Sequence, residues 1–290
     1  MNVLVTGGCG FIGYALTKEL LLKGYNVDVI DNLSIGREAK DVAALGANFL
    51  GCDVRAMENI PLKNYKYIFH LAALSRIQPS FTNPKLTFSV NVEGTRQIVE
   101  YALKTKSKLI YSGSSSRHHN PQLSPYAMSK HMGEEWIKMY KTICGLNAEL
   151  VRFYNVYGSG ELVDSHMAAV IGVWRAQVKK NYPITIVGDG KQRRDFTHIN
   201  DIVDGLIKVA ESDEKHEDAW ELGTGKNYSI NEVADMFIDK FKCVKVYMSE
   251  QKGNYRETIR INNDAVERLG WRPTDCLKEY VNLLYEKNNG

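Results

Sequence analysis

The chain has 290 residues, of which 44% are hydrophobic and 24% are charged, and its formal net charge is +3. These proportions are typical of a folded globular protein, so they exclude a disordered tail, a collagen-like fibre and a small disulfide-rich scaffold. Because the slight basic excess is spread along the chain, it does not form the stripe expected of a nucleic-acid-binding protein. We therefore expect no nucleic-acid partner.

The distribution of apolar residues and cysteines indicates a cytoplasmic protein. No run of about 18 uncharged apolar residues is present, so we expect no membrane span. The first six residues, MNVLVT, lack the basic segment of a signal peptide. The five cysteines are odd in number and contain no C-x-x-C pair. That usage fits a reducing compartment, and we expect neither a disulfide framework nor a metal site.

Short β-branched runs alternate with longer helical patterns in the first half of the chain. In chain order we predict a strand at 3–6, a helix at 12–23, strands at 27–31, 48–50 and 67–71, a helix at 84–104, a strand at 108–112, a helix at 126–143 and a strand at 148–153. Such alternation predicts an α/β fold with a doubly wound parallel sheet of the Rossmann type. Beyond residue 153 the regularity weakens. We therefore predict a first domain of residues 1–153 and a smaller α/β domain of residues 154–290, partly interleaved with the first.

Three glycines lie between the first predicted strand and the first predicted helix, at Gly7, Gly10 and Gly13. Without side chains there, the backbone can touch a pyrophosphate, whose charge is favoured at a helix N-terminus. The spacing differs by one residue from the usual G-x-G-x-x-G, and a tight turn is the alternative interpretation. Phe11 and Ile12 lie in the same loop and are predicted cofactor contacts with the glycines.

Two acids follow the next strands at the positions where a dinucleotide would need them. Asp31 and Asn32 end the second strand, where a carboxylate accepts the ribose hydroxyls of adenosine. A carboxylate there repels a 2′-phosphate, which favours NAD over NADP. The nearby Arg37 would favour NADP if its guanidinium faced the cofactor and not the solvent. Asp53 and Val54 are placed to meet the adenine, with a helix cap as the alternative for Asp53. The loop and these acids together predict an NAD site.

Tyr126 and Lys130 are four residues apart on a predicted helix, so they share one face. An ammonium near a phenol lowers the pKa of the phenol from about 10, which would let Tyr126 take a proton from an alcohol while a hydride leaves the same carbon. An exposed Tyr–Lys pair is the alternative. Ser114 belongs to a serine run after a strand, at the sheet edge where α/β sites form. Its hydroxyl could bond the reacting oxygen, and a polar loop is the alternative.

Over nearly its whole length the chain resembles the extended short-chain dehydrogenase/reductases that act on nucleotide sugars. Besides the features above, the resemblance rests on His70-Leu71-Ala72-Ala73, Asn91-Val92-Glu93-Gly94-Thr95, Arg152-Phe153-Tyr154-Asn155-Val156-Tyr157-Gly158, Arg194-Asp195-Phe196 and Leu269-Gly270-Trp271. It implies NAD as the cofactor, with Leu71, Ala72, Ala73 and Asn91 among the contacts. It also implies a homodimer formed by the helices predicted at 84–104 and 126–143.

The resemblance gives each matching residue a role. Tyr126 would be the catalytic base, Lys130 its pKa-lowering partner that also holds the nicotinamide ribose, and Ser114 the partner of the sugar O4. The residues implied to contact the substrate are Ser115, Ser116, Asn155, Ala169, Val170, Arg194, Arg256 and Thr258. Within that set, Arg194 matches an arginine that binds the diphosphate. The backbone at 168–171 matches a segment that contacts the nucleotide base. Thr258 matches a gate position, where a tyrosine in some relatives excludes an N-acetyl group.

The chain departs from the family pattern in two places. Only about a dozen residues separate Ser114 from Tyr126, fewer than in the family, and His118-His119 replaces a Tyr-Gly pair. We expect these two histidines to be exposed loop residues. The family R-x-G-D reads Gln251-Lys252-Gly253-Asn254, so Arg256 or Lys252 would have to supply a second phosphate-binding cation.

Among the reactions of this family, the residues favour 4-epimerisation of a nucleotide-diphosphate sugar, a UDP-hexose or UDP-N-acetylhexosamine, through a transient 4-keto sugar. Family dehydratases and decarboxylases carry an acid just after the position of Ser114, where this chain has Ser115 and Ser116. A 4,6-dehydratase or another nucleotide-sugar oxidoreductase is the alternative within the enzyme class. A non-catalytic NAD-binding sensor or scaffold is the alternative from another class, although such relatives usually lose the tyrosine or the lysine.

Overall fold

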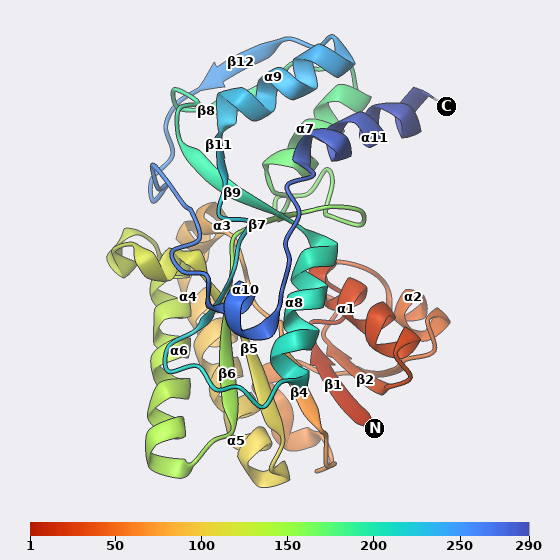
Figure 1. Cartoon of the computed structure of the whole chain (residues 1–290), viewed down its shortest axis with the longest axis vertical. Coiled ribbons are helices and arrows are strands. Elements are labelled where there is room, and N and C mark those ends of the chain that lie inside the picture. The colour runs from red at the N-terminus through yellow and green to blue at the C-terminus, as the bar shows by residue number, and fades with distance from the viewer. Residues whose placement is uncertain (290) are drawn as a thin grey trace.

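The protein is built around a seven-stranded parallel sheet, seen in a computed structural model that describes residues 1–289 (Figure 1). The strands are β1 (Asn2–Thr6), β2 (Asn26–Asp31), β3 (Asn48–Gly51), β4 (Tyr67–His70), β5 (Lys108–Ser114), β6 (Ala148–Phe153) and β10 (Trp220–Leu222). Their order is β10-β6-β5-β4-β1-β2-β3. The chain direction across the sheet reverses between β1 and β4, where α/β proteins bind ligands. The predicted Rossmann-type fold is confirmed.

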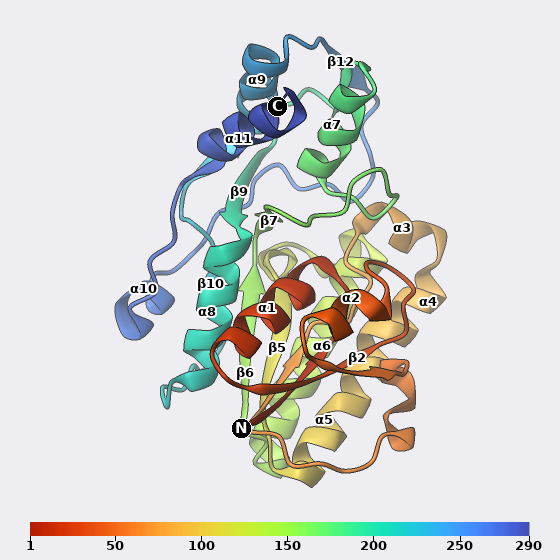
Figure 2. The same ribbon diagram turned by 90° about the vertical axis from the view of Figure 1, so that its right-hand side faces the viewer.

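Helices cover both faces of this sheet. One face packs against α1 (Phe11–Leu22), α8 (Ile199–Glu211) and α10 (Asp264–Leu269), and the other against α5 (Gly94–Thr105) and α6 (Pro125–Cys144). Alternate residues of β1 follow this division, since Val3 and Val5 belong to the first core and Leu4 to the second. In Figure 2, α1 and α8 lie in front of β5 and β6. The shorter α2 (Ala39–Ala44) and the 3₁₀ turn η1 (Val54–Asn59) flank β3.

The helix predicted at 84–104 is interrupted. It divides into α4 (Pro84–Phe88), a π-helical turn η2 (Ser89–Glu93) and α5, and is preceded by α3 (Ile77–Thr82). Asn91, in the π turn, is buried and bonds the segment after β4. Its amide donates to the Leu74 carbonyl at 3.0 Å and to Ser129 Oγ at 2.9 Å, and its oxygen accepts from the Leu74 N–H at 2.8 Å. The interruption therefore ties the loop after β4 to α6.

The second half of the chain adds a smaller layer, which lies above the large sheet in Figure 1. It contains the strands β7 (Asn155–Tyr157), β9 (Arg193–His198) and β11 (Asn227–Ser229), the pair β8 (Ile184–Val187) and β12 (Lys245–Met248), and the helices α7 (Val170–Lys179), α9 (Ile230–Phe241) and α11 (Leu277–Asn289). Trp174 and Phe237 meet edge to face in its core. Because α8 and β10 return to the large sheet, the two halves share elements, and the boundary at 153 stays a prediction.

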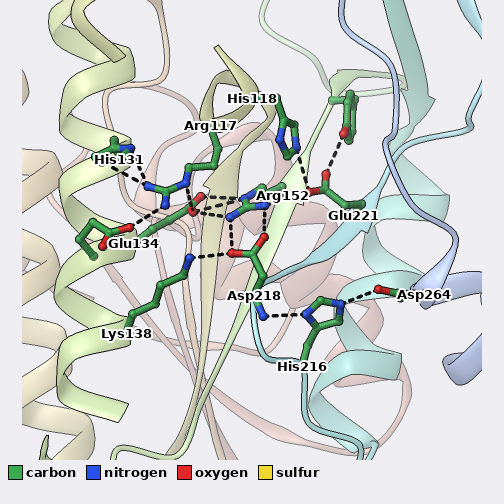
Figure 3. Close-up of polar contacts among 12 residues, drawn as sticks. Arg117, His118, His131, Glu134, Lys138, Arg152, His216, Asp218, Glu221 and Asp264 are labelled. Atoms are coloured by element: carbon green, nitrogen blue, oxygen red, sulfur yellow. Dashed lines mark hydrogen bonds and ion pairs between the residues drawn. The ribbon is translucent and has the colours of Figure 1, made fainter. Parts of the chain in front are cut away.

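A buried guanidinium joins strands β6 and β10 of the large sheet to helix α6 (Figure 3). Arg152, on β6, bonds Glu134 of α6 at 2.7 Å, Asp218 at 2.7 Å and Glu221 of β10 at 3.0 Å. The Glu134 and Glu221 side chains are almost completely buried, as is Arg152. Buried charges are tolerated only when they are paired. The cluster therefore fixes α6 and β10 relative to β6.

Arg152→Ala should lower the free energy of unfolding by about 3–5 kcal/mol, because it removes the guanidinium that pairs most closely with the buried Glu134 and also pairs with the buried Glu221. Urea denaturation followed by circular dichroism measures this loss. The control is Lys208→Ala, which breaks an exposed pair with Asp204 on α8 and should cost no more than about 0.5 kcal/mol. Equal losses in the two variants would contradict the role given to Arg152.

Candidate active site

The loop between β1 and α1 forms a cradle of bare backbone at the carboxyl edge of the sheet. Gly7 has a φ of +73°, and a Cβ added to it would lie 2.7 Å from the backbone nitrogen of Ala72. A Cβ on Gly13 would lie 2.1 Å from the Gly7 carbonyl oxygen. Because α1 begins directly after Gly10, its unpaired N–H groups end at this loop. The cradle fits an anionic dinucleotide, with Leu71 and Ala72 packed against Gly7, and the cofactor contact of Ala73 stays a prediction.

Next to the glycine loop is a hollow of about 280 Å³, lined by Asp31, Asn32, Leu33, Gly51, Cys52 and Asp53. Asp31 accepts hydrogen bonds from the N–H groups of Cys9 at 3.0 Å and Leu33 at 2.8 Å, while burial raises its pKa. Asp53 caps η1 and binds the Arg55 guanidinium, which holds the pKa of that carboxyl well below its usual value. Asp53 is thus a helix cap in the structure. Contact of Asp53 or of the buried Val54 with adenine stays a prediction.

Arg37 does not neutralise Asp31. Its guanidinium donates to the Gly160 carbonyl at 3.1 Å and lies over the Tyr14 ring, 4.0 Å from the centroid. No cation is among the groups that shift the pKa of Asp31. The hollow therefore presents a carboxylate without a counter-charge, which suits ribose hydroxyls and disfavours a 2′-phosphate.

Ser114 and Tyr126 are brought together where β5 ends and α6 begins. The Ser114 hydroxyl and the charge of Arg76 both lower the pKa of Tyr126, but burial outweighs them and leaves that pKa above its ordinary value. The start of α6 is fixed by two serines. Ser124 Oγ accepts from the Ala127 N–H and Ser80 Oγ from the Tyr126 N–H, each at 3.1 Å. The phenol predicted to act as a base is thus held next to the predicted Ser114.

Lys130 is buried on α6, four residues after Tyr126. Its ammonium donates to the Ser112 carbonyl at 2.7 Å and lies 5.0 Å from the centroid of the Tyr111 ring. Burial lowers the pKa of Lys130 to about 8. The shared helix face is present, but the lysine side chain is directed to β5. Its contact with the nicotinamide ribose stays a prediction.

Arg76 is a site residue that the sequence analysis did not single out. It lies between β4 and α3, and its Nε donates to the Met167 carbonyl at 2.7 Å. Its charge acts on Tyr126 and on the buried Glu161. A usable signal was in the sequence, because Arg76 is the one charged residue of the stretch 71–77, directly after a buried strand. That place is at the carboxyl edge, where α/β sites form.

The predicted substrate contacts occupy several elements around this centre. Ser115 begins the 3₁₀ turn η3 (Ser115–His118), and Asn155 lies half-buried on β7. Ala169 is the N-cap of α7 and Val170 its first residue. The hydroxyls of Ser116 and Thr258 are buried and have no hydrogen-bond partner within residues 1–289. These orphan hydroxyls are what a polar ligand would satisfy.

The two predicted phosphate-binding arginines are in different surroundings. Arg194, on β9, donates to the Arg193 carbonyl at 2.8 Å, and burial lowers its pKa to about 10. Arg256 is exposed and pairs with Asp189 at 3.0 Å, although its charge is close enough to act on Arg194. Contact of Arg194 or Arg256 with a diphosphate stays a prediction.

The expectation that His118 and His119 are exposed loop residues is wrong, because both are half-buried. His118 Nε2 lies 2.9 Å from Glu221 Oε1, and Glu221 also accepts from the Tyr154 hydroxyl at 2.7 Å (Figure 3). The His119 ring stacks on Tyr255, with centroids 4.0 Å apart and planes 8° apart. Loop composition could not reveal these partners, since both lie more than a hundred residues away in the sequence.

Comparison with known proteins identifies the family. Residues 3–223 match the model of the NAD dependent epimerase/dehydratase family. The chain belongs to this family. It is 31% identical to a UDP-glucuronate 4-epimerase from Thermodesulfobacterium geofontis, over 95% of this chain and 92% of that relative.

Two solved structures of the family are similar over almost the whole chain. A UDP-glucose 4-epimerase from Thermotoga maritima, solved with UDP-glucose, has a TM-score of 0.91 and 27% identity and covers 99% of this chain and 98% of its own. A UDP-glucose 4-epimerase from Thermus thermophilus, solved with NAD, has a TM-score of 0.88 and 25% identity, and the match covers 100% of this chain and 99% of that one. NAD is the cofactor of this family, and the glycine cradle and Asp31 fit it.

Two absences accompany the site. Within residues 1–289, no cluster of three or more histidine, cysteine or acidic side chains could hold a metal ion. Over the same residues, no helix has the length and apolar character needed to cross a membrane.

Replacing Arg76 by glutamine should move the activity profile to higher pH. The Arg76 charge lowers the pKa of Tyr126, so its removal raises that pKa, and a tyrosine that acts as a base is then deprotonated only at higher pH. We expect kcat/KM at neutral pH to fall several-fold and to recover as the pH rises. Arg268→Gln, which breaks an exposed pair with Glu214, is the control. A lower kcat/KM with an unchanged profile would contradict the electrostatic role.

Proposed function

We propose that this protein is an NAD-dependent 4-epimerase of a nucleotide-diphosphate sugar, either a UDP-hexose or a UDP-N-acetylhexosamine. The observation that carries the proposal is the set of groups around Tyr126. Ser114 and Arg76 act on the phenol, and the carboxylate that also acts on it, Glu134, is bound to Arg152. Dehydration or decarboxylation of the family type uses an acid beside Ser114, and serines stand there instead. The groups present can move a proton at one oxygen without removing a second proton from carbon.

In the proposed reaction Tyr126 takes the proton of the sugar O4 as carbon 4 is oxidised, and returns a proton to that oxygen after the 4-keto ring has turned. Bound NAD supplies the reversible hydride acceptor that this oxidation requires. Ser114 holds the same oxygen by a hydrogen bond, and Lys130 holds the ribose next to the reacting carbon. Arg194 binds the diphosphate, and the backbone at Ala169 and Val170 meets the base. Such positioned acid–base groups contribute about 10²–10⁴-fold to a rate.

Thr258 is the basis for including N-acetyl sugars. It is buried, it bonds β9 through its backbone, and its side chain is smaller than the tyrosine expected to close the gate. We therefore propose that the pocket has room for an N-acetyl group at carbon 2, with Asn155 as a further sugar contact.

We also propose that the protein is a homodimer. Leu86 on α4, and Met132 and Met139 on α6, are exposed apolar side chains on the helices that the family resemblance places at an interface. Ile98 is fully buried, so it faces the sheet. A monomer in sedimentation would contradict this proposal.

The proposed function is tested by NMR of the protein incubated with UDP-N-acetylglucosamine, UDP-glucose and UDP-glucuronate in turn. We expect one or more of them to yield the 4-epimer, and Tyr126→Phe to lower kcat at least about a hundredfold. Epimerisation of UDP-glucose with rejection of the N-acetyl sugar would contradict the role of Thr258. A stable 4-keto product would indicate a dehydratase or oxidase. Unchanged sugars in every tube would favour a non-catalytic dinucleotide sensor.

A further inference from the structure

A short segment, residues 252–258, is fastened across the candidate site at both ends. At one end the Gln78 side chain donates to the Lys252 carbonyl at 2.8 Å, and a Cβ on Gly253 would lie 3.0 Å from both Ile77 and the Leu123 carbonyl. At the other end the segment bonds β9, where the Arg193 N–H donates to the Arg256 carbonyl at 2.8 Å. The residue between these attachments, Tyr255, is therefore held in a fixed position.

Tyr255 is buried, and its ring is fixed by stacking on His119. Its hydroxyl lies close to the hydroxyls of Ser116 and Ser124, but within residues 1–289 neither the Tyr255 hydroxyl nor the Ser116 hydroxyl makes a hydrogen bond of normal geometry. An unpaired buried hydroxyl costs free energy unless water or a ligand satisfies it. A polar ligand between the Tyr255 and Ser116 hydroxyls would complete the hydrogen bonding of both.

The surroundings of Tyr255 indicate which part of a ligand would lie there. Its phenol interacts electrostatically with Tyr126, the proposed base, and with Arg194, the proposed diphosphate ligand. Tyr126 would meet the sugar O4 and Arg194 the diphosphate, so a side chain between these two residues would face the sugar ring. A sugar carries hydroxyls at several carbons, each of which can donate or accept a hydrogen bond.

We propose that Tyr255 is a substrate-contacting residue. Its phenol hydroxyl and the Ser116 side-chain hydroxyl hydrogen-bond the sugar ring of the nucleotide sugar. This rests on the proposed function. The shortened segment between Ser114 and Tyr126 contains His119. The His119 ring stacks on the Tyr255 ring and so holds the Tyr255 phenol at the sugar. The Tyr-Gly pair that this chain lacks is thus replaced by a wall built from two distant parts of the sequence.

Tyr255→Phe tests the proposal, because it keeps the ring and its stack and removes only the hydroxyl. We expect kcat/KM for the preferred UDP-sugar to fall about tenfold, mainly through a higher KM. The thermal midpoint of the sugar-free, NAD-loaded protein should be unchanged or higher, since the lost hydroxyl was unpaired. Stabilisation by added UDP-glucose should be smaller than in the wild type.

The control is Tyr25→Phe, which removes a phenol hydroxyl bonded to Glu211 next to the opposite edge of the sheet and should leave KM unchanged. A wild-type KM in Tyr255→Phe overturns the proposal and leaves the proposed function standing, whether or not the thermal midpoint falls. If the wild type is stabilised by UDP-glucose but converts none of the three UDP-sugars, the proposed function fails, and equal stabilisation of the wild type and Tyr255→Phe then overturns the role of Tyr255. A wild type that neither converts nor binds nucleotide sugars overturns both.

Discussion

The candidate site depends on the burial of one guanidinium. Arg152 is buried and pairs with Glu134, Asp218 and Glu221, so a rotation or sliding of α6 would separate Glu134 from its closest counter-charge inside the protein. Tyr126 lies about two turns before Glu134, and Lys130 about one turn before it, on the same face of that helix. Through Glu221 the constraint also reaches His118, and with it the short segment after Ser114. The fixed position of the Tyr126 phenol is thus a consequence of the ion pairs that Arg152 makes with α6 and β10.

The parts of this structure that the sequence predicts are those encoded by local spacing. Alternating strands and helices define the parallel sheet, and the glycine loop and Asp31 follow from the needs of one backbone turn and one strand end. The i,i+4 spacing also puts Tyr126 and Lys130 on one helix face, but spacing does not say where a flexible side chain ends. Lys130 is directed to Ser112, and Arg76 provides the charge that acts on the phenol.

What could not be predicted comes from contacts between distant segments. Arg76 follows β4, Tyr255 lies near the end of the chain, and His119 is in the loop after β5, yet Arg76 acts on Tyr126, Tyr126 acts on Tyr255, and the His119 ring stacks on Tyr255. The two departures from the family pattern have a common resolution here. The shortened segment contributes His119, and the altered R-x-G-D segment is followed by Tyr255. Only the folded chain shows that these two changes meet, because each alone looks like a loss.

The central claim is that carbon 4 of the sugar is oxidised and reduced again before the sugar leaves the site. The most direct test uses a UDP-sugar that carries deuterium at carbon 4, with the product analysed by NMR and mass spectrometry. The proposed reaction predicts that the deuterium remains at carbon 4 in both epimers, because it leaves as hydride and is returned within one turnover. Loss of the deuterium to water, or its absence from the product as a lasting 4-keto sugar, would contradict the proposed reaction.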